Sequence, residues 1–194
     1  MLHAVAGNLS LEPCTADRLS TQAWQLQPVV PTAGGVGAMN GSFRLALAGP
    51  AGGGSSCGAT SGVDSSKGCC LDLHDSADQA TLQVRPCSSG STDAHQLLYA
   101  YPGGSICTPS STVTCDGQPG GAAERVPCCL TVAGGSTAPG VALNMYAGVA
   151  DWPCQPACLN QQFDQRPASH GGVLLKARNE GLCVTARAGS ATSP

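Results

Sequence analysis

The sequence predicts an all-β fold made of three similar units, and three observations support this prediction. Apolar and polar residues alternate in short segments such as 70–73 and 81–86, which is the period of half-buried strands. The 26 glycines and 14 prolines supply many turns, while no long segment has apolar residues at helical spacing. The strand segments also recur along the 194 residues, as expected for a symmetric β array whose repeats bury their apolar faces together.

The first unit opens the chain and is completed by its end. Alternating segments at 8–14, 22–27 and 42–48 predict three strands, and the Gly- and Ser-rich stretch 49–68 predicts a loop. Residues 70–73 then bring the first repeat to about 8–73. The segment 181–186 has the same strand type as 70–73, so we expect this last strand to close the first repeat.

The second and third units repeat this order. The second, about 80–132, has predicted strands at 81–87, from Gln96 onward, at 105–107 and at 126–132. The third, about 140–186, has them at 141–147, from 160–163, at 172–177 and at 181–186. Each unit thus contributes four strands to one domain that spans residues 1–194.

Charge and cysteine content restrict the partners and the compartment. The net charge is −3 and the nine Lys and Arg residues are scattered singly, which argues against nucleic acid and acidic membrane surfaces. Twelve cysteines favour disulfides and an extracellular or secretory location. The first ten residues lack the features of a signal peptide, and no segment is long enough to insert into a membrane. We therefore expect a part of a larger secreted polypeptide.

Three glutamine motifs carry a resemblance to a known family. Each follows a strand ending in or near a cysteine and precedes a segment of the Cys-Leu-Asp-Leu type. They are Gln22 to Trp24, Gln96 to Leu98, and Gln161 to Phe163. From about residue 8 to residue 186 the chain resembles the ricin B-chain-like β-trefoil lectins. The resemblance implies a twelve-stranded β-trefoil with pseudo-threefold symmetry. We expect Trp24, Leu98 and Phe163 to pack near the symmetry axis as core residues.

The resemblance also implies disulfide pairs. In the family, the cysteine of the first strand pairs with the cysteine that ends the second strand. Carried over, this implies Cys70–Cys87, Cys129–Cys154 and Cys14–Cys183. Matched spacings suggest Cys57–Cys69 and Cys115–Cys128, and leave the pairing of Cys107 and Cys158 open.

A zinc site is the competing use of these cysteines. Cys154, Cys158 and His170 loosely fit a ligand pattern, but no second pair at ligand spacing completes a tetrahedral set. We therefore expect neither a metal nor a cofactor.

Each repeat can be compared with the sugar-binding residues of the family, which are an Asp, an aromatic residue and an Asn-Gln pair. The third repeat has Tyr146, Asn160 and Gln161, but Gly134 stands where Asp is expected. Tyr146 would stack on the sugar while the two amides take its hydroxyls.

The other two repeats depart further from the family pattern. The second repeat has Asp75 and Gln96, with Arg85 at the aromatic place and His95 at the Asn place. It would take a different or acidic glycan, or form only a solvated ion pair. The first repeat keeps Gln22 alone; its other places hold Glu12, Thr21 and Ala188.

These residues predict a non-catalytic carbohydrate-binding module for a galactose-like or other terminal sugar. The alternative is a disulfide-stapled scaffold or interaction domain that has lost sugar binding, for example one that is accessory to a glycoside hydrolase. No catalytic motif is present, so we expect no enzyme activity. Asn8 and Asn40 lie in N-glycosylation sequons, which predicts a glycoprotein.

Overall fold

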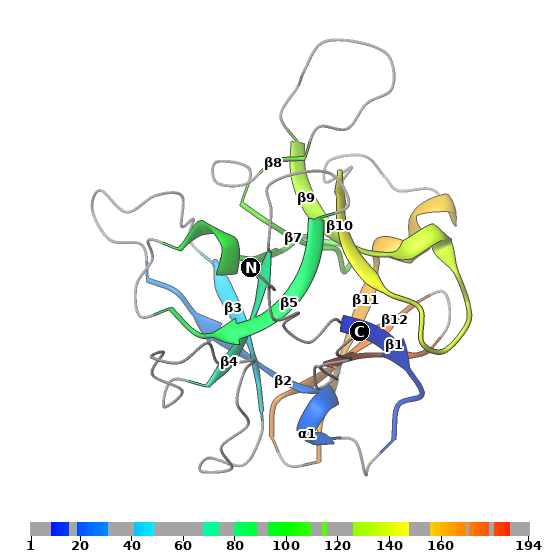
Figure 1. Ribbon diagram of the computed structural model, residues 1–194, viewed down its shortest axis with the longest axis horizontal. Helices are drawn as coiled ribbons and strands as arrows, with labels where there is room; N and C mark the ends of the chain where they lie inside the picture. Colours follow the sequence, from blue (N-terminus) through cyan, green and yellow to red (C-terminus); the bar gives the residue numbers. More distant parts are fainter. Residues whose placement is uncertain are drawn as a thin grey trace, which may run out of the picture.

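The fold is seen in a computed structural model of the chain (Figure 1). The residues described are 9–15, 19–30, 41–48, 68–73, 80–88, 93–109, 114–115, 126–147, 156–169, 171–178 and 181–186. Thirteen strands and a few single helical turns make up the regular structure of this part of the chain, which confirms the all-β prediction.

Most of the strands lie in the segments predicted from the sequence, while the helical turns and the short strand at Thr114–Cys115 were not predicted. Their bounds are β1 Leu9–Glu12, α1 Leu19–Gln22, β2 Ala23–Pro28, β3 Phe43–Leu47, β4 Cys69–Leu73, β5 Ala80–Pro86, η3 Ala94–Gln96, β6 Tyr99–Ala100, β7 Ile106–Cys107, β8 Thr114–Cys115, β9 Val126–Val132, η4 Ala133–Gly135, β10 Leu143–Ala147, η5 Pro156–Gln161, β11 Phe163–Pro167, β12 Val173–Ala177 and β13 Cys183–Ala186.

All strand pairs in the described residues are antiparallel. Three of them join a strand that contains a Cys-Leu-Asp-Leu type segment to a neighbouring strand: β13 with β1, β4 with β5, and β9 with β10. The main path of the sheet runs β1-β13-β12-β2-β3-β4-β5-β10-β9-β7-β6. A bridge between Ser10 and Ala142, and a hydrogen bond from the Leu11 amide to the Val141 carbonyl, bring β1 back to the start of β10. The strands β1, β5 and β10 therefore lie together near the middle of Figure 1.

The larger of two apolar clusters is filled by alternate residues of these strands. Successive side chains point to opposite faces, so the residues on either side of a core position face outward. Trp24 and Leu98 are fully buried and Phe163 is 2% exposed, in the core as predicted. The indole Nε1 of Trp24 donates to the Val184 carbonyl across 3.2 Å, which satisfies its polar atom inside the core.

The glutamine motifs begin differently from the prediction. No strand starts at Gln96, because this residue ends the helical turn η3; likewise Gln22 ends α1 and Gln161 ends η5. In the second repeat the carboxylate of Asp93 accepts a hydrogen bond from the His95 amide, which caps the turn. Period-2 alternation alone does not reveal such a turn, because it occupies only three residues.

Two of the expected disulfides are present and a third expectation is wrong. Cys14 pairs with Cys183 and Cys70 with Cys87. Cys129 is bonded to Cys107, so it does not pair with Cys154. The reason is geometric: β7 is hydrogen-bonded to β9, and Cys107 lies directly opposite Cys129 in that register.

The other predicted disulfides and the zinc pattern each include a residue whose side chain lies outside the described part of the chain. Cys69 and Cys128 are disulfide-bonded, and no described cysteine is free. Their expected partners, Cys57 and the side chain of Cys115, lie outside the description. Cys154, the side chain of Cys158 and His170 lie outside it too. In the part of the chain that the structure describes, no helix is long and apolar enough to cross a membrane.

Candidate functional site

The three matching strand pairs present equivalent positions on their outer faces. The register pairs Ser10 with Thr185, Asp72 with Gln83, and Thr131 with Asn144. The residues on either side of these positions, such as Leu71 and Val84, belong to the apolar core. Period-2 geometry therefore turns each polar pair away from the core.

The same hydrogen bond occurs at each of these polar pairs. A buried glutamine at the end of a helical turn donates from Nε2 to the third residue of a Cys-Leu-Asp-Leu type segment, and these segments are 183–186, 70–73 and 129–132. The three bonds are Gln22 to Thr185 Oγ1 (2.9 Å), Gln96 to Asp72 Oδ2 (3.1 Å) and Gln161 to Thr131 Oγ1 (3.0 Å). Each glutamine thus fixes a helical turn against a strand, and the residue before it is placed beside the outer face.

In the second repeat the glutamine bonds a buried carboxylate. Asp72 is 4% exposed, and Gln83 donates to its Oδ1 across 3.1 Å while Gln96 donates to its Oδ2. Burial raises the pKa of Asp72, and the two amide donors together with the positive charge of Arg85 partly offset that rise. The result is a carboxylate held in one orientation by two donors.

Arg85 and His95 lie beside this carboxylate. Arg85 is exposed and stands opposite Cys70, on the same face as Asp72. His95 is half-buried, and its Nδ1 lies 2.8 Å from the Leu73 carbonyl. A carbonyl only accepts, so Nδ1 carries the proton and donates. Asp75, the carboxylate predicted for this repeat, lies outside the described residues.

In the third repeat an aromatic ring stands at the surface. Tyr146 is 41% exposed and lies opposite Cys129 in the β9–β10 pair. On the same face Thr131 Oγ1 donates to the Cys129 carbonyl and accepts from Gln161. Asn144 Oδ1 is buried and has no hydrogen-bond partner among the described residues. An exposed ring therefore lies near an acceptor whose bonding capacity is unused.

Asn160 and Gly134 complete the description of this repeat. Asn160 is half-buried and precedes Gln161 at the end of η5, so the bond between Gln161 and Thr131 places it next to β9. Gly134 is exposed in η4 with a φ of 63°. It brings no side chain to the site, as the sequence indicated.

The first repeat has no aromatic residue at the corresponding place. Glu12 stands there, opposite Cys183, and accepts a hydrogen bond from Ser10 Oγ across 3.3 Å. Gln22 also donates to the Pro13 carbonyl and accepts from the Thr15 amide. The polar atoms of Gln22 are engaged within the protein, and Ala188 lies outside the described residues.

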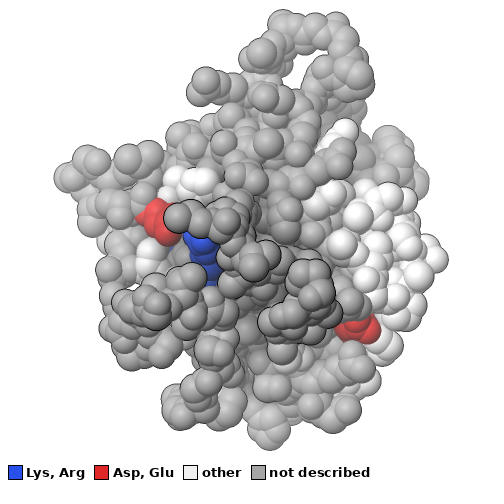
Figure 2. All heavy atoms as spheres, viewed as in Figure 1, with Lys and Arg blue, Asp and Glu red and all other residues white. Residues whose placement is uncertain are grey.

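Charge and ligand type restrict what these faces can bind. On the face shown in Figure 2, the described charged side chains form one small basic area and two separate acidic areas. No group of three or more His, Cys, Asp or Glu side chains in the described ranges is arranged to hold a metal ion. In the second repeat the charges are of both signs, because Asp72 and Arg85 share one face of the β4–β5 pair.

Sequence reasoning missed four residues of these faces. It predicted neither Asp72 and Gln83 in the second repeat nor Thr131 and Asn144 in the third. The pairing of Cys70 with Cys87 gave a usable signal, because that disulfide sets the register that puts Asp72 opposite Gln83. In the third repeat the corresponding disulfide is absent, since Cys129 pairs with Cys107.

No protein-family model matches this chain. No curated protein matches it either.

Proposed function

We propose that this chain is a non-catalytic carbohydrate-binding module with a ricin-type β-trefoil fold. In this proposal each of the strand pairs β1–β13, β4–β5 and β9–β10 carries the sugar-binding position of one repeat. The hydrogen bond from a glutamine to the third residue of a Cys-Leu-Asp-Leu type segment occurs at all three strand pairs, and this recurrence supports the assignment of three repeats. The ligand is a galactose-like or other terminal sugar on a glycan.

The exposed ring of Tyr146 carries the proposal for the third repeat. A pyranose has one face lined with C–H groups, and an exposed aromatic ring offers that face a flat apolar surface. The half-buried side chain of Asn160 then takes hydroxyl groups at the rim. Gln161 acts as a positioning residue, because its Nε2 is already bonded to Thr131.

The second repeat provides a second and weaker site in this proposal. Asp72 is an acceptor held by Gln83 and Gln96, and Arg85 and His95 lie on either side of it in this proposal. No aromatic ring stands at the place of Arg85, so the stacking surface is missing there. A sugar at this position depends on charge-assisted hydrogen bonds alone.

One observation favours the second candidate function, a scaffold or interaction domain that has lost sugar binding. Asp72 is almost completely buried, and each of its oxygens already accepts a bond from a glutamine. A network that is satisfied within the protein stabilises the fold without any ligand. Such a scaffold would serve a larger extracellular protein, for example as an accessory domain of a glycoside hydrolase.

The remaining features of the proposal concern location. Disulfides form and persist in oxidising compartments, so the bonded cysteines support secretion. In a secreted glycoprotein the sequons at Asn8 and Asn40 would be glycosylated; both residues lie outside the described part of the chain. A glycosidase-dependent loss of mass in the secreted protein tests this.

A glycan array probed with the oxidised protein tests the function. If the third repeat binds, the signal disappears with Asn160→Ala and persists with Asp72→Asn. Loss with Asp72→Asn alone moves binding to the second repeat. No signal from folded protein contradicts sugar binding and favours the scaffold.

A further inference from the structure

A pocket of about 520 Å³ lies next to the disulfide that joins Cys14 to Cys183. Pro13, Leu174 and Leu182 give it apolar walls. None of the residues that line it belongs to the second- or third-repeat sites described above. A volume in this range suits a small ligand of the size of a monosaccharide.

Two cations from the β11–β12 hairpin also line this pocket, Arg166 and Lys176. The register places Arg166 opposite Leu174, and Lys176 opposite Asp164. Residues two apart on paired strands share a face, so the two cations and Leu174 are presented to the same side of the hairpin. The pocket therefore combines an apolar wall with two positive charges.

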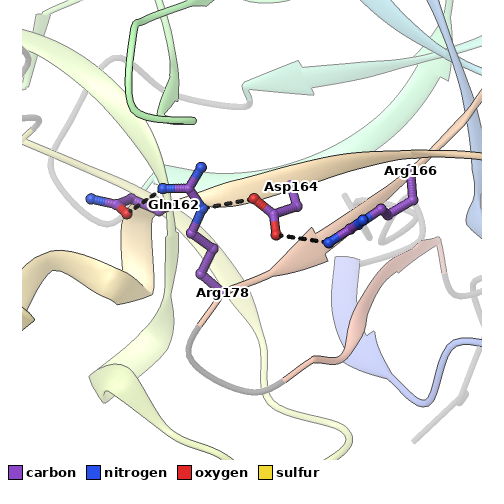
Figure 3. Close-up of polar contacts among 4 residues, drawn as sticks. All are labelled: Gln162, Asp164, Arg166 and Arg178. Carbon is purple, nitrogen blue, oxygen red and sulfur yellow. Dashed lines mark hydrogen bonds and ion pairs between the residues drawn. The ribbon is translucent and has the colours of Figure 1, made fainter.

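The positive charge of this hairpin is only partly compensated within the described residues. Asp164 is the one carboxylate of β11 and β12, and it forms ion pairs with two cations, Arg166 and Arg178 (Figure 3). Arg178 Nε donates to Asp164 Oδ1 across 2.7 Å, while Arg166 lies 3.5 Å from Oδ2 with its side chain 63% exposed. In Figure 3 the carboxylate lies between the two guanidinium groups. The hairpin and Arg178 thus carry a local excess of positive charge in a chain whose net charge is −3.

Lys176 has room for its side chain because Gly181 lacks one. A Cβ at Gly181 would lie 3.1 Å from Lys176 Cε and 3.5 Å from its Nζ, and Gly181 has a φ of 73°. Across the described part of the chain, no carboxylate lies within ion-pair distance of Lys176. The ammonium group is therefore available to a ligand in the pocket.

We propose that this pocket binds an anionic saccharide, such as a uronic acid. Its carboxylate would contact the Arg166 guanidinium, whose planar donors match two carboxylate oxygens, and the Lys176 ammonium would supply a second charge. The C–H groups of the sugar ring would pack on Leu174, Leu182 and Pro13. This site is separate from the third-repeat site proposed for neutral sugars, and it goes beyond that function.

The test is an NMR titration of the ¹⁵N-labelled, oxidised protein with galacturonate, galactose and inorganic sulfate. We expect galacturonate to shift the amide signals of Lys176, Gly181 and Leu182. Its binding should weaken as NaCl is added, because salt screens the two positive charges. Galactose, which lacks the carboxylate, should leave these three signals in place. Inorganic sulfate should shift them only at concentrations well above those of galacturonate, because it cannot use the apolar wall.

Matched variants separate the pocket from general charge effects. Arg166→Met and Lys176→Met keep the aliphatic stem and should each weaken galacturonate binding by roughly fivefold to tenfold. Lys67→Met removes one positive charge from another part of the sequence and should leave the affinity unchanged. The amide spectrum of each variant shows whether it has folded.

Three results would overturn this inference. The first is the absence of shifts at Lys176, Gly181 and Leu182 with galacturonate. The second is an equal response to galactose or to inorganic sulfate. The third is unchanged galacturonate affinity in folded Arg166→Met and Lys176→Met proteins.

Discussion

Nε2 of Gln96 lies 3.1 Å from Oδ2 of Asp72 and donates to it, which ties the helical turn η3 to the middle of β4, 24 residues earlier. The same amide nitrogen donates to the Pro86 carbonyl, and Gln96 Oε1 accepts from the Ser88 amide. One side chain therefore connects β4, the end of β5 and η3. The orientation of Gln96 is fixed, because its donor and acceptor atoms are both engaged.

Removing this side chain should cost more stability than removing its counterpart in the third repeat. Gln96→Ala takes a donor from a buried carboxylate and a partner from the Ser88 amide, so we expect a loss of about 1.5–3 kcal/mol. Gln161→Ala should cost less, because Thr131 Oγ1 keeps its bond to the Cys129 carbonyl. Urea unfolding measures both, and exposed Gln165→Ala is the control. Equal losses in the two variants would contradict this ranking.

The buried carboxylate should make stability depend on pH. Because burial raises the pKa of Asp72 above its ordinary value of 3.8, the folded protein binds this proton more tightly than the unfolded chain does. Stability contributed by this group is therefore greatest below pH 3.8 and decreases as pH rises through the raised pKa. Asp72→Asn should lack this decrease.

The Asn variant is a suitable comparison because its amide can be accommodated. Oδ1 of the new side chain would accept from Gln96, and its NH₂ group would face Gln83, whose own amide can rotate to accept. Urea unfolding of both proteins between pH 4 and pH 7 gives the difference. Parallel pH profiles of wild type and Asp72→Asn would show that Asp72 does not titrate as described.

The third prediction is that peptide mapping will find Cys107 bonded to Cys129. Digestion without reduction should release a cross-linked species that contains Cys107 and Cys129 together with the partner of the neighbouring Cys128, and fragmentation of this species should assign Cys107 to Cys129. Replacing both by Ala should lower stability by about 3 kcal/mol, as expected for a bridge across 22 residues. Cys154→Ala should leave the bridge intact; a peptide that links Cys129 to Cys154 would refute the assignment.

The sequence allowed the strands and the core to be predicted because both depend on local alternation. Trp24, Leu98 and Phe163 were expected in the core and are buried there. The turn before each of these residues was not predicted, since it depends on caps such as that of Asp93 and on bonds to distant strands.

The site was less accessible to prediction, because it depends on register. From the sequence alone, Asp72 cannot be distinguished from other polar strand residues. Only the register shows that it lies opposite Gln83 and near Gln96. The pairing of Cys129 was misassigned for a related reason: the resemblance implied a partner after β10, whereas the structure pairs β9 with β7. Long-range strand pairing decides both outcomes, and periodicity within one segment does not contain it.

The most direct test of sugar binding is to follow the ring signals of the three tyrosines while the best glycan of the array is added. The ring of Tyr146 is exposed at the third-repeat site, whereas Tyr99 and Tyr101 contact each other edge to face. We predict that the ring signals of Tyr146 move and those of Tyr99 and Tyr101 do not. We further predict that Tyr146→Ala weakens binding about tenfold while Tyr146→Phe retains it. A glycan that binds without moving the Tyr146 signals, or that binds Tyr146→Ala as tightly as wild type, would contradict the proposed site.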